Sequence, residues 1–276
     1  MESKTVVITG PTSGIGKEIA IGLARLGANL VLGCRNVEAG KTVAGELGRV
    51  QDAARIDVVQ VDLASRKSIE AFAREILKKH ARLDVLVNNA GVSRGSQPWA
   101  KNEEGIELTL ATNVLGYFLT ARLLLPRLRE NARARIVNVA STFASDLDLD
   151  DLQFQRRPFE SMKAYAQSKA CDRLLTWALA RRLEGSGVTA NTMAPGLIVD
   201  TGLYRHTPRE VMAQLRQRGG GRTPSDGADT AIWLASSPEI EGVSGKFFEN
   251  RKEIPCSFRN RDAEERLWSI LESLAG

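Results

Sequence analysis

Cysteine and histidine are scarce in this sequence. Its 276 residues include 3 cysteines and 2 histidines. Cys34, Cys171 and Cys256 lie far apart and form no Cys-x-x-Cys pair, which argues against a disulfide framework and fits a reducing compartment. His80 and His206 have no metal-ligand partners at a suitable spacing. The sequence therefore predicts no metal site.

Long basic runs and long apolar runs are also missing. The net charge is +5, but the arginines are scattered and have no interleaved aromatic residues, so we expect no nucleic-acid partner. No apolar stretch approaches the ~20 residues of a membrane-spanning helix. The first strand-like run begins at Thr5, so we expect neither a signal peptide nor an N-terminal anchor. These absences predict a cytoplasmic protein without an integral membrane segment.

Short Val, Ile and Leu runs alternate with amphipathic helical patterns along the chain. Continuous apolar runs are typical of strands that are covered on both faces. We therefore expect one α/β domain over residues 1–276, with a Rossmann-type, doubly wound parallel sheet of about seven strands and helices on both faces. The expected strands are 5–9, 29–33, 58–61, 85–87, 135–139, 188–193 and 246–248.

Three segments depart from this alternation. Residues 143–160 form a polar and aromatic insertion, and residues 197–223 form a long connection. Long loops in compact domains are often lids or binding elements, so we expect 197–223 to serve as a substrate loop. Residues 250–276 form a C-terminal extension with one further helix over 262–274, which covers an edge or packs on the surface.

A glycine-rich turn connects the first expected strand to an amphipathic helix. Glycine allows a sharp turn and close approach to a pyrophosphate, and the helix N-terminus offers unpaired N–H groups. The spacing is G-x-x-x-G-x-G rather than G-x-G-x-x-G, and in isolation it would also fit a tight structural turn. Its position favours a dinucleotide site, with contacts from Gly10, Thr12, Ser13, Gly14, Ile15 and Gly16.

The end of the second strand indicates which dinucleotide is preferred. An acidic residue near this point usually holds the ribose of NAD, whereas an arginine accommodates the 2′-phosphate of NADP. Here Arg35 and Asn36 follow Cys34, so we expect NADP(H) rather than NAD(H), although Arg35 also fits a surface residue that begins a helix. Asp62 and Leu63 follow the third strand and are expected near the adenine. Asp62 would equally serve as the N-cap of the next helix.

Further motifs occur in an order that resembles the short-chain dehydrogenase/reductase family. The resemblance runs from Lys4 to about Phe248. Besides the glycine-rich turn, it rests on Asn88-Asn89-Ala90-Gly91, Asn113, Ser141, Tyr165-x-x-x-Lys169 and Pro195-Gly196. The gap of 24 positions between Ser141 and Tyr165, and the segment Gly33-Cys34-Arg35-Asn36, look like a branch that contains retinol-dehydrogenase-like, NADP-dependent enzymes.

Tyr165 and Lys169 also make chemical sense without this resemblance. They are four residues apart on a helix predicted over 161–184 and therefore share one face. A nearby ammonium would lower the tyrosine pKa, so that Tyr165 exchanges a proton with the substrate oxygen. Ser141 follows a strand at the carboxyl edge of the sheet, where its hydroxyl can bond the same oxygen. A single Tyr-x-x-x-Lys pair, taken alone, is usually a surface feature.

The resemblance implies further roles. Asn113 would hold a water that links to Lys169, or satisfy buried backbone groups. Asn89, Ala90 and Gly91 would pass beside the adenine ribose and the nicotinamide, although the asparagines also suit bracing of the sheet edge. Pro195, Gly196 and Ile198 would lie beside the nicotinamide. Asp200 stands where many relatives have threonine or serine, and Thr201 follows, so the carboxamide contact stays open.

The expected activity is that of a carbonyl reductase or alcohol dehydrogenase, with hydride moving between NADP(H) and a ketone, aldehyde or secondary alcohol. A non-catalytic dinucleotide-binding regulator is the alternative, and an epimerase or dehydratase is a third possibility. The resemblance also makes a homo-oligomer plausible. We expect a hydrophobic pocket, and hence a hydrophobic substrate, because the two loops supply Phe143, Leu147, Phe154, Phe159, Leu197, Leu203, Tyr204 and Met212.

Overall fold

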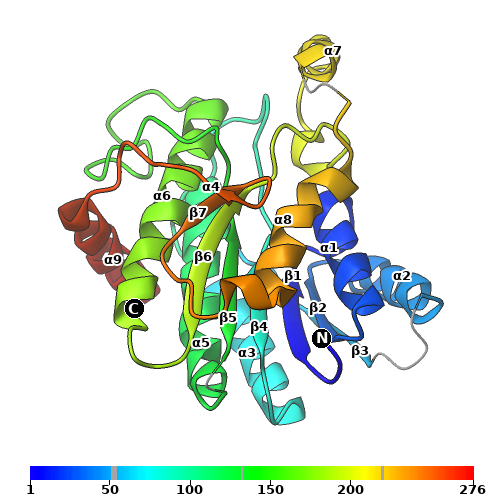
Figure 1. The fold of residues 1–276 in the computed structure, drawn as a ribbon. Coiled ribbons are helices and arrows are strands. Elements are labelled where there is room, and N and C mark those ends of the chain that lie inside the picture. Colours follow the sequence, from blue (N-terminus) through cyan, green and yellow to red (C-terminus); the bar gives the residue numbers. More distant parts are fainter. Residues whose placement is uncertain (51–54, 132, 219–220) are drawn as a thin grey trace.

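A computed structural model describes residues 1–50, 55–131, 133–218 and 221–276. Eight strands form one sheet in the order β3-β2-β1-β4-β5-β6-β7-β8, and every pairing is parallel except that of β7 with β8 (Figure 1). The strands are β1 (Thr5–Thr9), β2 (Asn29–Cys34), β3 (Ile56–Gln60), β4 (Val85–Asn88), β5 (Arg135–Val139), β6 (Thr189–Ala194), β7 (Phe247–Glu249) and β8 (Lys252–Glu253).

The predicted fold class is confirmed, with one strand more than expected. All seven predicted strands are present, and their bounds differ from the predicted ones by at most two residues. The eighth strand, β8, has two exposed, charged residues and pairs antiparallel with β7 at the edge of the sheet. It has no apolar run, so the sequence pattern that identifies covered strands could not reveal it.

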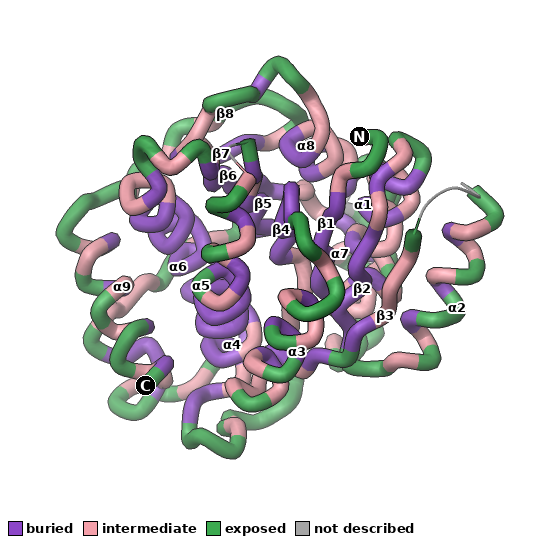
Figure 2. Tube along the Cα trace, turned by 90° about the horizontal axis from the view of Figure 1, so that it is seen from below, coloured by how far each residue is buried: buried purple, intermediate pink, exposed green. Residues whose placement is uncertain are grey.

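Helices cover both faces of the sheet. On one face, α1 (Gly14–Arg25), α2 (Val37–Gly48) and α8 (Pro224–Ser236) share a core with β1 and β2. On the other face lie α3 (Arg66–Lys79), α5 (Gly116–Arg129) and α6 (Ser161–Arg182). Figure 2 shows buried residues concentrated in the strands and in the helices of this second face. Continuous apolar strands are therefore explained by burial from both sides.

The C-terminal extension packs against α6. The helix predicted over 262–274 is α9 (Arg261–Ala275), whose Leu267 and Leu271 are fully buried. Trp268 contacts the ring of Phe118 edge-on, with 5.0 Å between the ring centroids. The extension thus covers the outer side of α6, which explains why α6 is buried on almost all sides. The helix α6 ends at Arg182, two residues before the predicted end.

One long helical segment, Leu108–Arg129, contains a π-helical turn. It consists of α4 (Leu108–Leu110), the π-turn η1 (Ala111–Leu115) and α5. By length and composition it is the one described helix that could cross a membrane, contrary to the expectation that no apolar stretch is long enough. In the fold, 72% of its most apolar window is buried. The remaining short elements are η2 (Gly202–Tyr204), α7 (Arg209–Arg218) and η3 (Pro238–Ile240).

Candidate active site

A cavity of about 840 Å³ follows the carboxyl ends of the parallel strands, where open α/β sheets bind ligands. Of the predicted site residues, all but Gly14 and Asn113 line it. The lining includes Gly10, Thr12, Ser13, Ile15, Gly16, Arg35, Asn36, Asp62, Leu63, Asn89, Ala90, Gly91, Ser141, Tyr165, Lys169, Pro195, Gly196 and Ile198. Strand ends from most of the sheet width therefore meet at one groove.

The glycine-rich turn fits a pyrophosphate. Gly10 has φ +68°, a conformation that favours glycine, and a Cβ at Gly16 would lie 2.2 Å from the carbonyl oxygen of Gly10. Ser13 is the N-cap of α1, but its side chain makes no capping hydrogen bond, so the first N–H groups of the helix have no side-chain partner there. Gly14 does not line the cavity, and a Cβ at this position would come within 3.0 Å of the Thr201 side chain. This turn can hold an anion at a helix N-terminus.

Arg35 and Asn36 lie at the exposed rim of the groove, beyond the end of β2. The Asn36 side chain accepts a hydrogen bond from the Ala39 N–H (3.1 Å) and caps α2, so it has a structural role that the sequence did not reveal. Asp62 lines the cavity, and its carboxylate accepts from the Ala64 N–H (2.9 Å). The N-cap of α3 is Ser65, so the alternative in which Asp62 caps that helix is wrong.

Asn88, the last residue of β4, and Asn89, which follows it, brace the carboxyl edge of the sheet. Asn88 donates to Oδ1 of Asn138 on β5 (2.9 Å), and Asn89 donates to the carbonyl oxygens of Thr9 (2.9 Å) and Gly10 (3.1 Å). Asn89 also lines the cavity, so bracing and ligand contact are compatible in this residue. These bonds hold the end of β4 against the glycine-rich turn.

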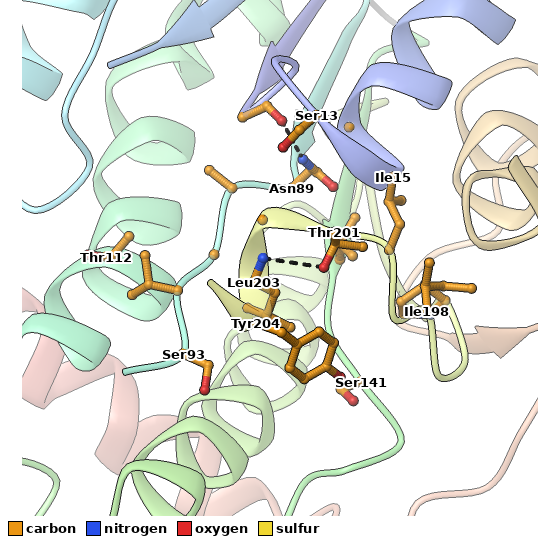
Figure 3. Close-up of a pocket in the computed structure, with 18 of the residues that line it drawn as sticks. Ser13, Ile15, Asn89, Ser93, Thr112, Ser141, Ile198, Thr201, Leu203 and Tyr204 are labelled. Atoms are coloured by element: carbon orange, nitrogen blue, oxygen red, sulfur yellow. Dashed lines mark hydrogen bonds between the residues drawn. The ribbon is translucent and has the colours of Figure 1, made fainter. Parts of the chain in front are cut away.

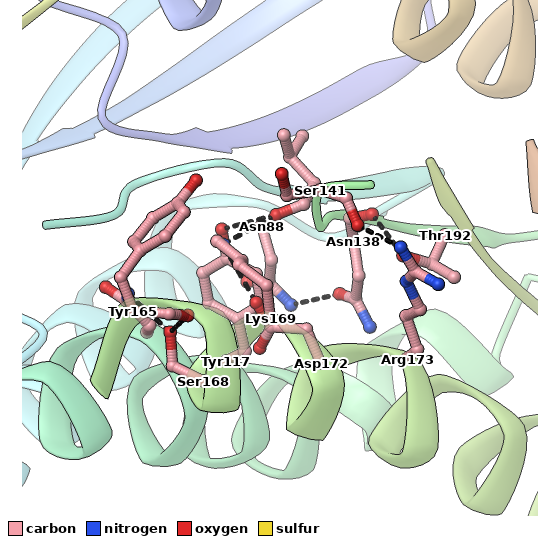
Figure 4. Close-up of polar contacts among 12 residues, drawn as sticks. Asn88, Tyr117, Asn138, Ser141, Tyr165, Ser168, Lys169, Asp172, Arg173 and Thr192 are labelled. Carbon is pink, nitrogen blue, oxygen red and sulfur yellow. Dashed lines mark hydrogen bonds and ion pairs between the residues drawn. The ribbon is translucent and has the colours of Figure 1, made fainter. Parts of the chain in front are cut away.

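Tyr165 and Lys169 lie on the face of α6 that is turned toward the groove (Figure 4). The Lys169 ammonium is buried and donates to the Val139 carbonyl oxygen (2.9 Å) and to Oδ2 of Asp172 (2.8 Å). Its Nζ atom is 6.0 Å from the centroid of the Tyr165 ring. The predicted juxtaposition of phenol and ammonium is thus present, together with a carboxylate that was not predicted.

The expected lowering of the Tyr165 pKa is wrong for this structure. Burial raises the pKa of Tyr165 to about 12, the hydrogen bond with Ser141 lowers it, and the charge of Asp172 raises it further. Burial is the largest cause of this rise, and the Lys169 ammonium is paired with Asp172 at 2.8 Å. Sequence spacing placed the ammonium near the phenol but did not account for the carboxylate on the next turn.

Ser141 and Asn113 differ in how directly they reach the groove. Ser141 lines it, its hydroxyl accepts from the Phe143 N–H (3.0 Å), and its carbonyl oxygen accepts from the guanidinium of Arg173. Asn113 lies in the π-turn, where its side chain exchanges hydrogen bonds with the backbone of Val92 (2.8 and 3.0 Å) and donates to Ser168 (2.9 Å). Asn113 therefore satisfies backbone groups, which was one of the two predicted roles.

Thr201, rather than Asp200, faces the cavity. Asp200 is exposed, whereas Thr201 lines the groove, and its hydroxyl accepts from the Leu203 N–H (3.2 Å), as Figure 3 shows. Many members of the family that this chain resembles have a threonine or serine at the position of Asp200. Here the hydroxyl is supplied by the next residue, Thr201. The adjacent Gly14 has φ +54° and leaves room for this threonine.

The apolar wall was predicted in part. Phe143, Leu197, Leu203 and Tyr204 line the cavity as expected. Leu147, Phe154, Phe159 and Met212 do not; Phe154 is buried and packs edge-on against Phe159 with a centroid distance of 5.5 Å. The wall is completed by residues that were not predicted: Val92, Met162 and Leu215. Each lies next to a predicted motif or within the predicted substrate loop, but the sequence does not show which of their side chains face the groove.

Comparisons with known proteins agree with the fold and the groove. Residues 4–211 match the short chain dehydrogenase family. Retinol dehydrogenase 14 of Homo sapiens is 39% identical, covering 100% of this chain and 87% of the relative. Retinol dehydrogenase 13 of Mus musculus is 38% identical, covering 99% and 84%.

Solved structures show the same architecture. The RhlG protein of Pseudomonas aeruginosa, in a complex with NADP, superposes with a TM-score of 0.73 at 29% identity, covering 90% of this chain and 94% of that one. A 3-ketoacyl-(acyl-carrier-protein) reductase from Brucella melitensis, complexed with NADH, has a TM-score of 0.71 at 27% identity, covering 90% and 97%.

The chain belongs to the short-chain dehydrogenase/reductase family. Within that family it is a member of the retinol-dehydrogenase-like branch. Its activity is that of an oxidoreductase that depends on a nicotinamide dinucleotide.

Proposed function

We propose that this protein is an NADP(H)-dependent carbonyl reductase or alcohol dehydrogenase that acts on a hydrophobic ketone, aldehyde or secondary alcohol. The observation that carries this proposal is the position of Tyr165, Ser141 and Lys169 together on one wall of the groove, opposite the glycine-rich turn. A carbonyl group placed against this wall would contact a proton donor and a second hydroxyl.

The residues present fit a nicotinamide dinucleotide, because the glycine-rich turn lines the groove and the first N–H groups of α1 have no side-chain partner from the N-cap. A side chain at Gly16 would collide with the Gly10 carbonyl oxygen and disrupt this turn. When bound, this cofactor supplies or accepts the hydride. Tyr165 would donate its phenol proton to the carbonyl oxygen in reduction and recover it in oxidation. Ser141 would hydrogen-bond the same oxygen and stabilise its developing charge. Lys169 donates a hydrogen bond to the Val139 carbonyl oxygen and so holds the end of β5 against α6.

The preference for NADP(H) rests on Arg35. Its side chain is exposed at the rim of the groove, at the strand end where the adenosine ribose of a dinucleotide lies in this class of fold. A guanidinium there can pair with a 2′-phosphate through two hydrogen bonds. The residues that follow β2 include no carboxylate before Glu38, so no acidic group at this strand end would repel that phosphate.

The substrate class rests on the outer half of the groove. Phe143, Met162, Leu203 and Leu215 form an apolar wall beside Tyr165, and the Phe143 and Tyr165 rings are nearly parallel with centroids 6.5 Å apart. Such a wall favours a lipid-like, aromatic or polycyclic carbonyl compound. The relatives named as retinol dehydrogenases are consistent with this class.

The test is the variant Tyr165→Phe, which removes one oxygen and leaves the ring. We expect turnover of aldehydes and ketones with NADPH to fall at least about a hundredfold, because general acid catalysis contributes about 10²–10⁴-fold. Binding of NADPH, followed by its fluorescence, should stay within about threefold of the wild type, since the phenol oxygen is remote from the phosphate-binding turn.

Tyr204→Phe is the matched control, because Tyr204 also lines the cavity and bears a phenol. We expect it to retain most of the turnover. Undiminished activity in Tyr165→Phe would contradict the catalytic role. Tight NADPH binding by the wild type without turnover of any compound in the panel would favour the regulator instead.

A further inference from the structure

The guanidinium of Arg173 is a buried cation beside Ser141 that the proposed reaction does not use. Arg173 lies on α6 and is 5% exposed. Arginine is almost never buried to this extent unless it is paired. Within the described part of the chain it forms no ion pair with a carboxylate, and burial lowers its pKa. The burial of this charge therefore has another explanation than an ion pair.

Aromatic rings from outside α6 hold the guanidinium in place. Its Cζ atom lies 3.8 Å from the centroid of the Phe247 ring on β7 and 5.3 Å from that of Phe258, in the segment before α9. One terminal nitrogen donates to Sγ of Cys256 (3.6 Å) in the same segment. Stacking on a ring face favours one plane of the guanidinium. The direction of its N–H groups is therefore set by β7 and by the C-terminal extension.

The other terminal nitrogen of Arg173 donates to the backbone carbonyl oxygen of Ser141 (Figure 4). At this point the chain has just left the sheet. The strand β5 ends at Val139, and the Ala140 N–H makes one more bond to β6, at the Met193 carbonyl oxygen (2.8 Å). Among the described residues, no backbone N–H donates to the Ser141 carbonyl. Arg173 thus supplies the hydrogen bond that the sheet no longer provides.

The position of the Ser141 hydroxyl depends on this backbone. The hydroxyl lines the groove and accepts from the Phe143 N–H, two residues later (3.0 Å). A turn closed by a serine side chain keeps its hydrogen bond only while the backbone keeps its conformation. Rotation of the peptide after Ser141 would turn the carbonyl oxygen away from Arg173 and the Phe143 N–H away from the hydroxyl. The two hydrogen bonds therefore support each other.

We propose that Arg173 is a positioning residue of the active site, whose guanidinium fixes the Ser141 backbone and so places the Ser141 hydroxyl against the substrate oxygen. This inference rests on the proposed function, in which Ser141 hydrogen-bonds that oxygen. It adds a residue that does not line the groove and that acts through Ser141. It also gives the C-terminal extension a part in the site, because Phe258 and Cys256 hold the guanidinium.

The variant Arg173→Met removes the donor and keeps a long, flexible side chain that can pack against Phe247 and Phe258. With NADPH and 4-nitrobenzaldehyde we expect kcat to fall about ten- to a hundredfold, because a displacement of about 1 Å in an active-site group can cost about a hundredfold. KM should change by less than about threefold, because the Ser141 hydroxyl stabilises charge that develops only as hydride arrives.

A double-mutant cycle with Ser141→Ala separates positioning from a purely structural role. If Arg173 acts through Ser141, Arg173→Met should change kcat by less than about threefold in the Ser141→Ala background. A fall as large as that in the wild-type background would overturn the proposal, because the arginine would then act on something else. If Arg173→Met does not fold, Arg173→Leu removes the same donor and enters the same cycle.

Arg182→Met is the matched control. Arg182 also lies on α6 and stacks on an aromatic ring, that of Trp268 at 4.0 Å, but it pairs with Glu265 and does not approach the groove. We expect its kcat to stay within about threefold of the wild type. A loss equal to that in Arg173→Met would contradict the proposal, since any disturbance of α6 would then suffice.

The backbone amide of Phe143 provides a readout that needs no turnover. The chain has 8 phenylalanines, so protein labelled with ¹⁵N-phenylalanine gives few amide resonances, and Phe143→Leu assigns the relevant one. In Arg173→Met we expect this resonance to move toward its position in Ser141→Ala, whereas Arg182→Met should leave it in place. A Phe143 resonance that Arg173→Met leaves unchanged would overturn the proposal. If the wild type reduces neither 4-nitrobenzaldehyde nor other aldehydes, the proposed function fails, whereas this resonance still decides the role of Arg173.

Discussion

At the scale of single residues, the choice between NADP and NAD depends on the side chain at position 35. We expect Arg35→Asp to lower kcat/KM with NADPH by at least about tenfold, because a carboxylate would repel the 2′-phosphate that the guanidinium pairs with. Efficiency with NADH should stay the same or rise. Steady-state kinetics with both cofactors and one aldehyde would measure the change.

Arg49→Asp is the control for this experiment. Arg49 is exposed at the opposite end of α2, so the variant makes the same change in net charge away from the groove. We expect its NADPH-to-NADH ratio to match that of the wild type. If the NADPH-to-NADH ratio of Arg35→Asp also matched that of the wild type, this result would argue against the assignment of Arg35.

Predictions for single residues were confirmed where local helix geometry determines the position of a side chain. They were wrong where a neighbouring residue in the fold changes the surroundings of that side chain. The spacing of Tyr165 and Lys169 predicted a shared helix face, which is a local property of helices. The effect of Asp172 on that pair depends on burial, which the sequence does not specify. Thr201 in place of Asp200 is a similar case, because the direction of each side chain is set by how the loop packs on Gly14.

At the scale of secondary-structure elements, the packing of α9 on α6 should contribute to stability. Leu267 has no exposed surface and lies in the core shared with α6. Leu267→Ala would leave a cavity, and we expect it to lower the free energy of unfolding by about 2–5 kcal/mol. Urea unfolding followed by circular dichroism would measure the loss.

Ser269→Ala serves as the comparison for this variant, since Ser269 is exposed on the same helix. It should change the free energy of unfolding by less than about 0.5 kcal/mol. Similar values for the two variants would mean that α9 is dispensable for the stability of the sheet and its helices.

The elements themselves were largely predictable from the sequence. Strands such as Thr5–Thr9 and Arg135–Val139 are rich in valine and isoleucine, and their bounds were predicted without error. The π-turn at Ala111–Leu115 was not predicted, because its residues have the same apolar character as the helix on either side. The insertion at 143–160 was identified, but Phe154 and Phe159 pack on each other rather than in the groove.

At the scale of the whole molecule, Asp84 joins parts of the chain that are distant in sequence. Its buried carboxylate accepts from the Thr5 N–H (2.9 Å), from Lys4 (2.9 Å) and Arg82, and from Asn131 (2.7 Å). Burial alone would raise the pKa of Asp84, but these hydrogen bonds outweigh it and hold the pKa below its ordinary value. The stabilisation is therefore present above about pH 4 and is lost as the pH falls through the lowered pKa.

We expect Asp84→Asn to lower the free energy of unfolding at pH 7 by about 1–3 kcal/mol, since an amide accepts fewer of these bonds. Below about pH 4 the wild type should lose this contribution, so the difference between the two proteins should narrow. Urea unfolding at pH 7 and at pH 3 would measure both quantities. If the difference in free energy of unfolding between the two proteins were the same at pH 7 and at pH 3, folding would not change the pKa of Asp84.

The two ends of the groove are assembled from different parts of the chain. The turn after β1 and the ends of β2 and β3 supply the end that holds Arg35, whereas the loop after β5, the start of α6 and the segment around η2 supply the end that holds Phe143, Met162 and Leu203. The two parts come into contact at Gly14 and Thr201, whereas Arg35 and Phe143 lie at different ends of the groove. During evolution, this architecture would let the preferred dinucleotide and the preferred carbonyl compound change independently, while the proton donor between them stays fixed.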